Sequence, residues 1–265
     1  MLVHRSTGRN PWNAARVGWR DLVILAGGLA AGGINAVVGS GTLITFPILV
    51  GFGYPPVVAN VSNTIGLVGG SATAIHGWRR ELRGNVRMSL ELATMSAVGA
   101  AAGAELLLQL PAGSFRRVAP VIIGIAVVLV VVQPFVARWV AEHRREGSGR
   151  PAAWIWLFTL AAGVYGGYFG AAQGVILIGV LGLALRGTLH EVNAIRNILA
   201  GTANLVGAIV FALVAPVNWR VALLIGVSST IGGWAGSHVG RRLPTPVVRV
   251  VVVCVGSFAI YKLTR

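Results

Sequence analysis

The chain has 265 residues, of which 55% are hydrophobic and only 11% are charged. A soluble domain usually carries about 25% charged residues, so this composition excludes a water-soluble globular enzyme, a disordered chain and a fibrous protein. We therefore expect an all-α, polytopic integral membrane protein. The formal net charge is +15, but the arginines stand at the ends of apolar stretches, where basic residues face lipid headgroups. Membrane lipids are the expected partners of these charges, and nucleic acid is not.

The chain opens with a basic segment, residues 1–20, whose arginines and two tryptophans indicate a lead-in at the membrane interface. Apolar segments follow in close succession. A full membrane crossing takes about 20 residues, and two of the segments, 42–53 and 174–186, are too short for this. The predicted apolar segments are 21–38, 42–53, 57–78, 88–110, 118–140, 153–172, 174–186, 191–214, 220–239 and 246–262.

Each short segment follows a glycine-rich break, Gly39-Ser40-Gly41 in the first half and Gly170-Ala171-Ala172-Gln173-Gly174 in the second. Short, glycine-interrupted segments at corresponding places in two halves indicate a transporter binding site. A helix that starts at such a break presents free N–H groups and the positive end of its dipole to an anion. The alternative is that the glycines serve close helix packing. The candidate substrate-binding residues of the breaks are Asn35, Ser40, Gly41, Gln173 and Gly174.

The two halves align without gaps at a shift of 133 residues, which places Asn60 on Asn193. Polar positions 0, 3, 4 and 11 residues along from these two asparagines lie on one helix face in both halves. We predict two homologous repeats of about 4–5 transmembrane segments each, residues 21–140 and 153–265, joined by a polar linker at 141–152. The two matching polar stripes are Asn60, Asn63, Thr64 and Ser71 in the first half, and Asn193, Arg196, Asn197 and Asn204 in the second. All of them except Ser71 are candidate substrate-binding residues.

Two topologies remain open at this point. If each broken pair of segments returns to the face where it started, the halves are inverted, and the Lys and Arg residues divide 9 against 12 between the two faces, leaving out Arg196. If each pair crosses once, the halves are parallel and the division is 15 against 6. The positive-inside rule favours the parallel arrangement, whereas the shortness of segment 42–53 favours a re-entrant hairpin.

Arg196 is the most informative residue, because a guanidinium deep in an apolar segment costs several kcal/mol, on the order of 2–4, unless it is paired. Its polar stripe holds no carboxylate. The planar fork of N–H donors suits an oxyanion, so we expect a bound anion there. The alternative is that Arg196 snorkels to the interface or caps a carbonyl of a neighbouring broken helix.

Coupling residues are weakly marked. Glu91, Glu105 and His76 could titrate in a proton-coupled cycle, but each also lies close enough to a segment end to be merely interfacial. Metal-ligand spacings, phosphate-binding loops and cofactor motifs are missing, and Asp21 is the only aspartate. We therefore expect no enzyme activity, no catalytic residues, no metal and no cofactor.

The stretch GGINAVVGSGTLITFPILVGFGYPPVVANVSNTIG resembles the first half-repeat of the TauE/SafE family of sulfite and organosulfonate exporters, and GVYGGYFGAAQGVILIGVLGL with EVNAIRNILAGTANLVG is similar to the second. The resemblance covers residues 20 to 262. It implies a secondary transporter that moves small sulfur-containing anions outward. Where family helix starts often read closer to Thr-Ser-Leu, this chain has Val61-Ser62-Asn63 and Ile195-Arg196-Asn197, which bears on the particular substrate.

From these observations we expect an exporter of a small anion, such as sulfite, a sulfonate or a related oxyanion, in the bacterial plasma membrane. Coupling to protons or another ion and alternating access belong to this expectation. A passive anion channel would use the same donors without a coupling residue. A membrane assembly factor or enzyme is the remaining alternative, and a homodimer is left open.

Overall fold

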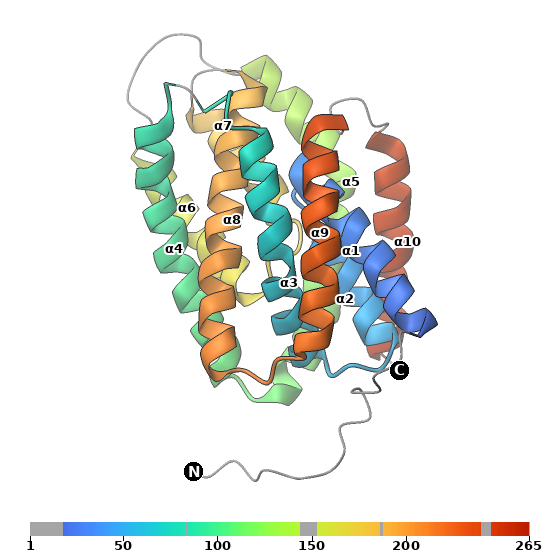
Figure 1. Cartoon of the computed structure of the whole chain (residues 1–265). Coiled ribbons are helices and arrows are strands. Elements are labelled where there is room, and N and C mark those ends of the chain that lie inside the picture. The colour runs from blue at the N-terminus through green and yellow to red at the C-terminus, as the bar shows by residue number, and fades with distance from the viewer. Residues whose placement is uncertain (1–17, 83, 144–152, 186–187, 240–244, 265) are drawn as a thin grey trace.

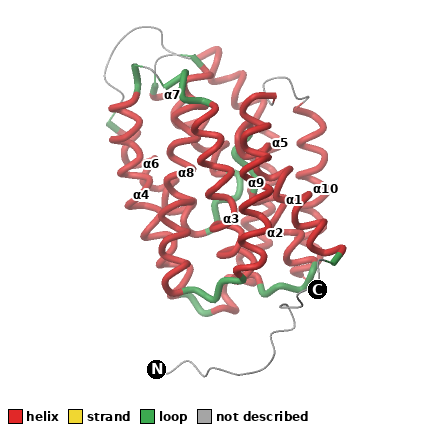
Figure 2. Tube along the Cα trace, in the orientation of Figure 1, coloured by secondary structure: helices red, strands yellow, loops and turns green. Residues whose placement is uncertain are grey.

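The computed structural model describes residues 18–82, 84–143, 153–185, 188–239 and 245–264. Within these ranges it contains ten helices and no strand (Figures 1 and 2), which confirms the all-α prediction. Most of the predicted basic segment 1–20 and of the linker 141–152 lies outside the described residues. The helices are α1 (Trp19–Val37), α2 (Thr42–Gly51), α3 (Pro56–Gly77), α4 (Val86–Gln109), α5 (Ala112–His143), α6 (Trp154–Tyr168), α7 (Gln173–Ala184), α8 (Leu189–Val214), α9 (Trp219–Val239) and α10 (Thr245–Thr264).

Four stretches of the described chain are long and apolar enough to cross a membrane by length and composition. They are Trp19–Val37, Val86–Gln109, Gly113–Val140 and Leu189–Val214. The helices after the two breaks, Thr42–Gly51 and Gln173–Ala184, fall short of that length. This agrees with the two short segments expected from the sequence.

The first break folds the chain back on itself, so that α1 and α2 form a hairpin. Trp19 at the start of α1 meets Phe52 at the end of α2, with ring centroids 5.4 Å apart in an edge-on arrangement. Halfway along, a Cβ placed on Gly27 of α1 would lie 2.6 Å from the Ile48 side chain of α2. The first hairpin therefore returns to the end of the molecule where α1 begins (Figure 1).

The second break has the same character and lies in the middle of the bundle, as the loop segments of Figure 2 show. The chain turns through left-handed backbone at Gly170 (φ +69°) and Ala172 (φ +58°). Glycine adopts this conformation without strain, whereas alanine does so rarely. The first residue of α7, Gln173, reaches back to donate from Nε2 to the Ala162 carbonyl of α6 at 2.9 Å. Each break thus brings a helix end and a helix start together inside the protein.

Small residues hold each hairpin against a long helix from the other half. Along α1, Gly28 and Gly32 have no room for a Cβ because Ser228 and the Ser229 backbone of α9 lie against them. Along α6, Gly167 packs on the Ala100 backbone of α4 in the same way. Such contacts let helix backbones approach closely, and dispersion then stabilises the packed pair in lipid, where the hydrophobic effect does not. α1 therefore packs on α9, and α6 packs on α4.

Candidate anion-binding site

Arg196 lies in the second turn of α8, whose start is fixed by a capping box between Thr188 and Glu191. Its side chain is only 1% exposed, so it does not snorkel to the surface. Nη2 donates to the Ala36 carbonyl at 3.0 Å and, more weakly, to the Asn35 carbonyl at 3.5 Å. The Ala36 carbonyl lies in the last turn of α1, where a helix leaves carbonyls without N–H partners, whereas the Asn35 carbonyl also accepts from the Gly39 N–H at 3.0 Å. Part of the guanidinium thus caps the broken end of α1.

The rest of the guanidinium is unsatisfied. Nε and Nη1 are buried and have no hydrogen-bond partner within the described chain. Nη1 points to the place where the two breaks touch: a Cβ on Gly174 would lie 2.7 Å from it, and one on Gly39 would also collide with it. Since an unpaired buried donor costs about 1–3 kcal/mol, and more when it is charged, these two groups favour a bound acceptor.

The two breaks are joined directly beside this guanidinium. The Gly174 N–H donates to the Gly39 carbonyl at 3.2 Å, and Gly39 adopts a left-handed conformation (φ +77°) that glycine tolerates. The helices that start here, α2 and α7, have no side chain capping their N-termini. The Ser40 hydroxyl is also buried without a partner. A guanidinium and the positive dipole ends of two helices without side-chain caps together form a positively polarised site for an anion.

A hydrogen-bonded chain of three polar side chains connects α1, α3 and α8. The Asn204 amide donates to Ser71 Oγ at 3.1 Å, and the Asn35 amide approaches the same oxygen at 3.5 Å. Ser71 and Asn204 are the last members of the two predicted stripes. The structure therefore brings these positions into contact at the crossing of α3 and α8.

Asn193 and Asn197 complete the surroundings of Arg196. Asn197 Oδ1 accepts from Arg196 Nη2 at 3.2 Å, and its Nδ2 donates to the Ala36 and Asn193 carbonyls at 3.3 and 3.0 Å. Asn193 keeps a buried Oδ1 without a partner. Asn197 thus orients the guanidinium while sharing its capping role.

The stripe of the first half is engaged elsewhere. Asn60 is fully buried and donates from Nδ2 to the Tyr168 carbonyl at the end of α6, at 3.0 Å, while its Oδ1 has no partner. Asn63 donates to the Thr42 hydroxyl at 3.3 Å and accepts from Thr45, both on α2. Thr64 bonds within its own helix to the Asn60 carbonyl at 3.0 Å. None of these hydrogen bonds involves Arg196.

The two glycines named from the sequence have different surroundings. Gly174 faces Arg196. A Cβ on Gly41 would instead lie 2.6 Å from the Ala31 carbonyl of α1, so this glycine allows the first hairpin to close. Gly39, rather than Gly41, is the residue of the first break that meets the guanidinium. Its position in the same glycine cluster was the only sequence signal for this role.

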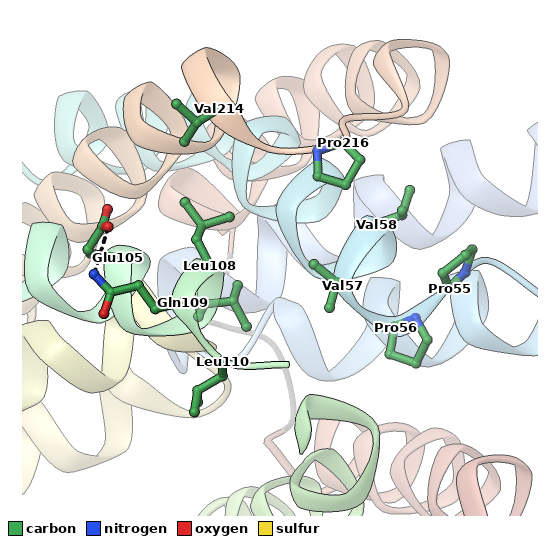
Figure 3. Close-up of a pocket in the computed structure, with 11 residues that line it drawn as sticks. Pro55, Pro56, Val57, Val58, Glu105, Leu108, Gln109, Leu110, Val214 and Pro216 are labelled. Atoms are coloured by element: carbon green, nitrogen blue, oxygen red, sulfur yellow. Dashed lines mark hydrogen bonds between the residues drawn. The ribbon is translucent and has the colours of Figure 1, made fainter. Parts of the chain in front are cut away.

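The three residues that were considered for coupling form hydrogen bonds or ion pairs with neighbours on or beside their own helices. Glu91 pairs with Arg87 at 3.0 Å on exposed α4 surface, and His76 contacts Arg79. Glu105 accepts from Gln109 at 2.9 Å. Glu105 and Gln109 line a cavity at the lower end of the molecule as Figure 1 draws it, and Figure 3 shows this cavity in close-up.

This cavity has a volume of about 690 Å³ and is otherwise mostly apolar. It opens where the start of α3, the end of α4 and the end of α8 come together. The Glu105 and Gln109 side chains point toward each other on one side of it, and the first residues of α3 line the other (Figure 3). The remaining lining residues are Pro55, Pro56, Val57, Val58, Leu107, Leu108, Leu110, Val214 and Pro216.

Broken helices that meet inside a helical bundle beside a buried charge are the architecture of membrane transporters. The chain belongs to the TauE/SafE family, since the family described as "Sulfite exporter TauE/SafE" matches residues 24–263. It is accordingly a multi-pass membrane protein.

Curated relatives agree with this membership. The chain is 26% identical over 238 residues to "Probable membrane transporter protein YfcA" of Escherichia coli K12, covering 88% of this chain and 87% of that protein. It is 28% identical over 229 residues to "Probable membrane transporter protein ORF9" of Sinorhizobium sp, covering 85% of each. A "Probable membrane transporter protein" of Haemophilus influenzae is 25% identical over 243 residues, covering 90% and 94%. No solved structure matches the chain.

Proposed function

We propose that the chain is a secondary transporter, operating as an exporter, of small sulfur-containing oxyanions such as sulfite or sulfoacetate. The observation that carries the proposal is the buried guanidinium of Arg196, whose Nε and Nη1 lack partners where the two breaks meet. An oxyanion accepting from both donors would complete the fork, the Ser40 hydroxyl would supply a further donor, and the positive dipole ends of α2 and α7 would add electrostatic attraction. Export and the sulfur chemistry follow from the family description.

The proposal includes two inverted repeats, residues 21–140 and 153–265. Packing supports it, because corresponding helices have corresponding neighbours: α1 packs on α9 as α6 packs on α4, and α10 packs on α2 as α5 packs on α7. In Figure 1, α3 runs from the lower end to the upper end and α8 runs the opposite way. Ser71 and Asn204, which are equivalent at a shift of 133 residues, bond to each other, as expected for residues on a pseudo-twofold axis. Such repeats provide alternating access by rocking around a fixed site.

The test is a melting experiment on purified protein with sulfite, sulfoacetate, thiosulfate and sulfate. A ligand that binds the native state raises the melting temperature by mass action. Arg196→Gln removes a charge-assisted contact worth about 1.5–3 kcal/mol, so affinity should fall roughly tenfold or more. Arg196→Lys keeps the charge without the fork and should keep part of the affinity.

Arg138→Gln is the matched control, because Arg138 is an exposed arginine on α5. This variant should retain the anion-induced rise in melting temperature in full. An equally full rise in Arg196→Gln would remove Arg196 from the site. In the parent protein, the guanidinium would then serve only to cap the end of α1.

Uphill flux separates the proposal from a passive channel. In proteoliposomes, a coupled transporter should accumulate the anion against its concentration gradient when a pH gradient or another ion gradient is imposed. A channel would only dissipate the anion gradient.

A further inference from the structure

The two ends of the molecule differ at positions that correspond under the proposed shift of 133 residues. At the lower end, the start of α3 lines the open cavity of about 690 Å³. The corresponding start of α8 at the upper end, where His190 is exposed, is joined to the residues that follow α3 by a ring stack and a hydrogen bond. The comparison below rests on the proposed function, because it uses the same repeat.

An aromatic stack lies at the upper end. The ring of Trp78, which follows α3 and is 4% exposed, stacks on the exposed His190 ring of α8 at a centroid distance of 5.9 Å, with the ring planes 27° apart. Trp78 and the nearby Leu82 are part of one buried cluster with Val192 and Ile195 of α8. Ile195 directly precedes Arg196, so this cluster adjoins the guanidinium along α8.

A polar contact closes the same region from α4. The Asn85 amide at the start of α4 donates to Glu191 Oε2 at 3.5 Å, and this carboxylate also accepts from the Thr188 N–H at 3.4 Å. Glu191 thus joins the starts of α4 and α8. The stack and this bond hold the ends of three helices together.

The corresponding residues at the lower end make no such contacts. The shift of 133 places Val57 opposite His190 and Val58 opposite Glu191. Valine can neither stack on a ring nor accept an amide hydrogen, and both valines line the open cavity. Beyond them, Asn60, the first polar residue of α3, is fully buried and does not line the cavity.

We infer that Trp78, His190, Asn85 and Glu191 form the closed gate of an alternating-access cycle, and that the cavity beside Val57 and Val58 is the open vestibule of the same state. The structure thus corresponds to a conformation that admits the anion from the end where α1 begins. When the gate opens, the lower end should close by a rotation about the pseudo-twofold axis between the two proposed repeats.

Cysteine labelling tests the inference without any anion. Cys254 is the only cysteine of the chain, so Cys254→Ala gives a background free of thiols. In nanodiscs, a hydrophilic maleimide reaches both faces. The Val58→Cys thiol should react quickly, because Val58 lines the cavity, and the Val192→Cys thiol at least tenfold more slowly, because Val192 is buried under the gate.

The decisive readout is coupling between the ends. Trp78→Ala should speed labelling of the Val192→Cys thiol at least tenfold and, at the distant lower end, slow labelling of the Val58→Cys thiol several-fold. Removal of Trp78 could expose Val192 locally, but it cannot locally protect Val58. His190→Ala and Glu191→Gln, which leave the buried cluster intact, should shift both rates in the same directions. Trp154→Ala removes an exposed tryptophan at the start of α6 and should change neither rate.

Unchanged labelling of the Val58→Cys thiol in Trp78→Ala, His190→Ala and Glu191→Gln would overturn the gate. This outcome is independent of the anion proposal, which the melting experiment decides. Coupled labelling together with a full anion effect in Arg196→Gln would support the gate while rejecting the anion site. Uncoupled labelling together with loss of the anion effect in Arg196→Gln would support the anion site while rejecting the gate.

Discussion

The ends of α1 and α6 pose the same physical problem, because each helix stops inside the protein with carbonyls that lack helical partners. At α6, the neutral amide of Asn60 caps the Tyr168 carbonyl from α3. At α1, Arg196 and Asn197 of α8 cap the Ala36 carbonyl. Since a neutral side chain suffices at α6, capping alone does not explain a guanidinium at α1. The difference between the two ends leaves Nε and Nη1 available to a ligand.

The largest expected effect comes from adding one methyl group at each break. In Gly174→Ala the Cβ would lie 2.5 Å from the Gly39 Cα and 2.7 Å from Arg196 Nη1, so it would force the two breaks apart, at a cost in stability, and displace the guanidinium from the junction. We expect the anion-induced rise in melting temperature to disappear. Gly41→Ala presses instead on the Ala31 carbonyl and should destabilise the ligand-free protein by about 1–3 kcal/mol, while the folded fraction still binds. Normal transport by both variants would show that the breaks serve packing only.

A second pair of variants tests whether the two caps have different roles. Asn60→Leu leaves the buried Tyr168 carbonyl without its partner, which should cost about 1–3 kcal/mol of stability with little change in anion affinity. Asn197→Leu removes both a cap on Ala36 and the acceptor that orients Arg196, so stability and affinity should fall together. Melting curves with and without anion measure both quantities. Equal losses of affinity in the two variants would place Asn60 in the binding site as well.

The outer ends of the hairpins should show the smallest effects. At the start of α1, Asp21 pairs with Arg220 of α9 at 2.7 Å and accepts from the Gly18 N–H at 2.9 Å. Asp21→Asn should therefore lower stability by about 1 kcal/mol. The exposed pair Arg87 and Glu91 lies within α4 alone, so Glu91→Gln should cost no more than about 0.5 kcal/mol. If the melting temperature falls further for Glu91→Gln than for Asp21→Asn, the Asp21 pair does not stabilise the protein more than the Glu91 pair, and the prediction is wrong.

Much of the fold could be predicted from hydropathy, because each apolar segment became a helix and each glycine cluster became a break. The return of α2 to its starting end could not. The basic residues divide 15 against 6 under the parallel arrangement and only 9 against 12 under the hairpin topology, so the positive-inside rule favoured the arrangement in which α2 does not return. The contact that shows the return, between Trp19 and Phe52, joins residues too far apart for helical periodicity to connect.

The candidate site was predictable as a set of polar positions but not as a set of contacts. The depth of Arg196 in its apolar segment indicated a buried charge. Periodicity placed Asn63 on the same stripe as Asn60, yet Asn63 bonds to Thr42 and Thr45 because α2 returns alongside α3. The choice between Gly39 and Gly41 likewise depends on which residue of the turn faces α8. Such details require the tertiary arrangement.

The hairpin at each break has a consequence for the origin of the chain. With the hairpins returning, each proposed repeat crosses the membrane an odd number of times, so a duplicated half would insert in the orientation opposite to its twin. A half-length ancestor would have needed to insert both ways round, which requires little bias of basic residues between its faces. The nearly even division of 9 against 12 in the present sequence matches that requirement. Under the proposed repeat, Arg196 takes the place of Asn63, so the two halves differ chemically at the position that carries the buried charge.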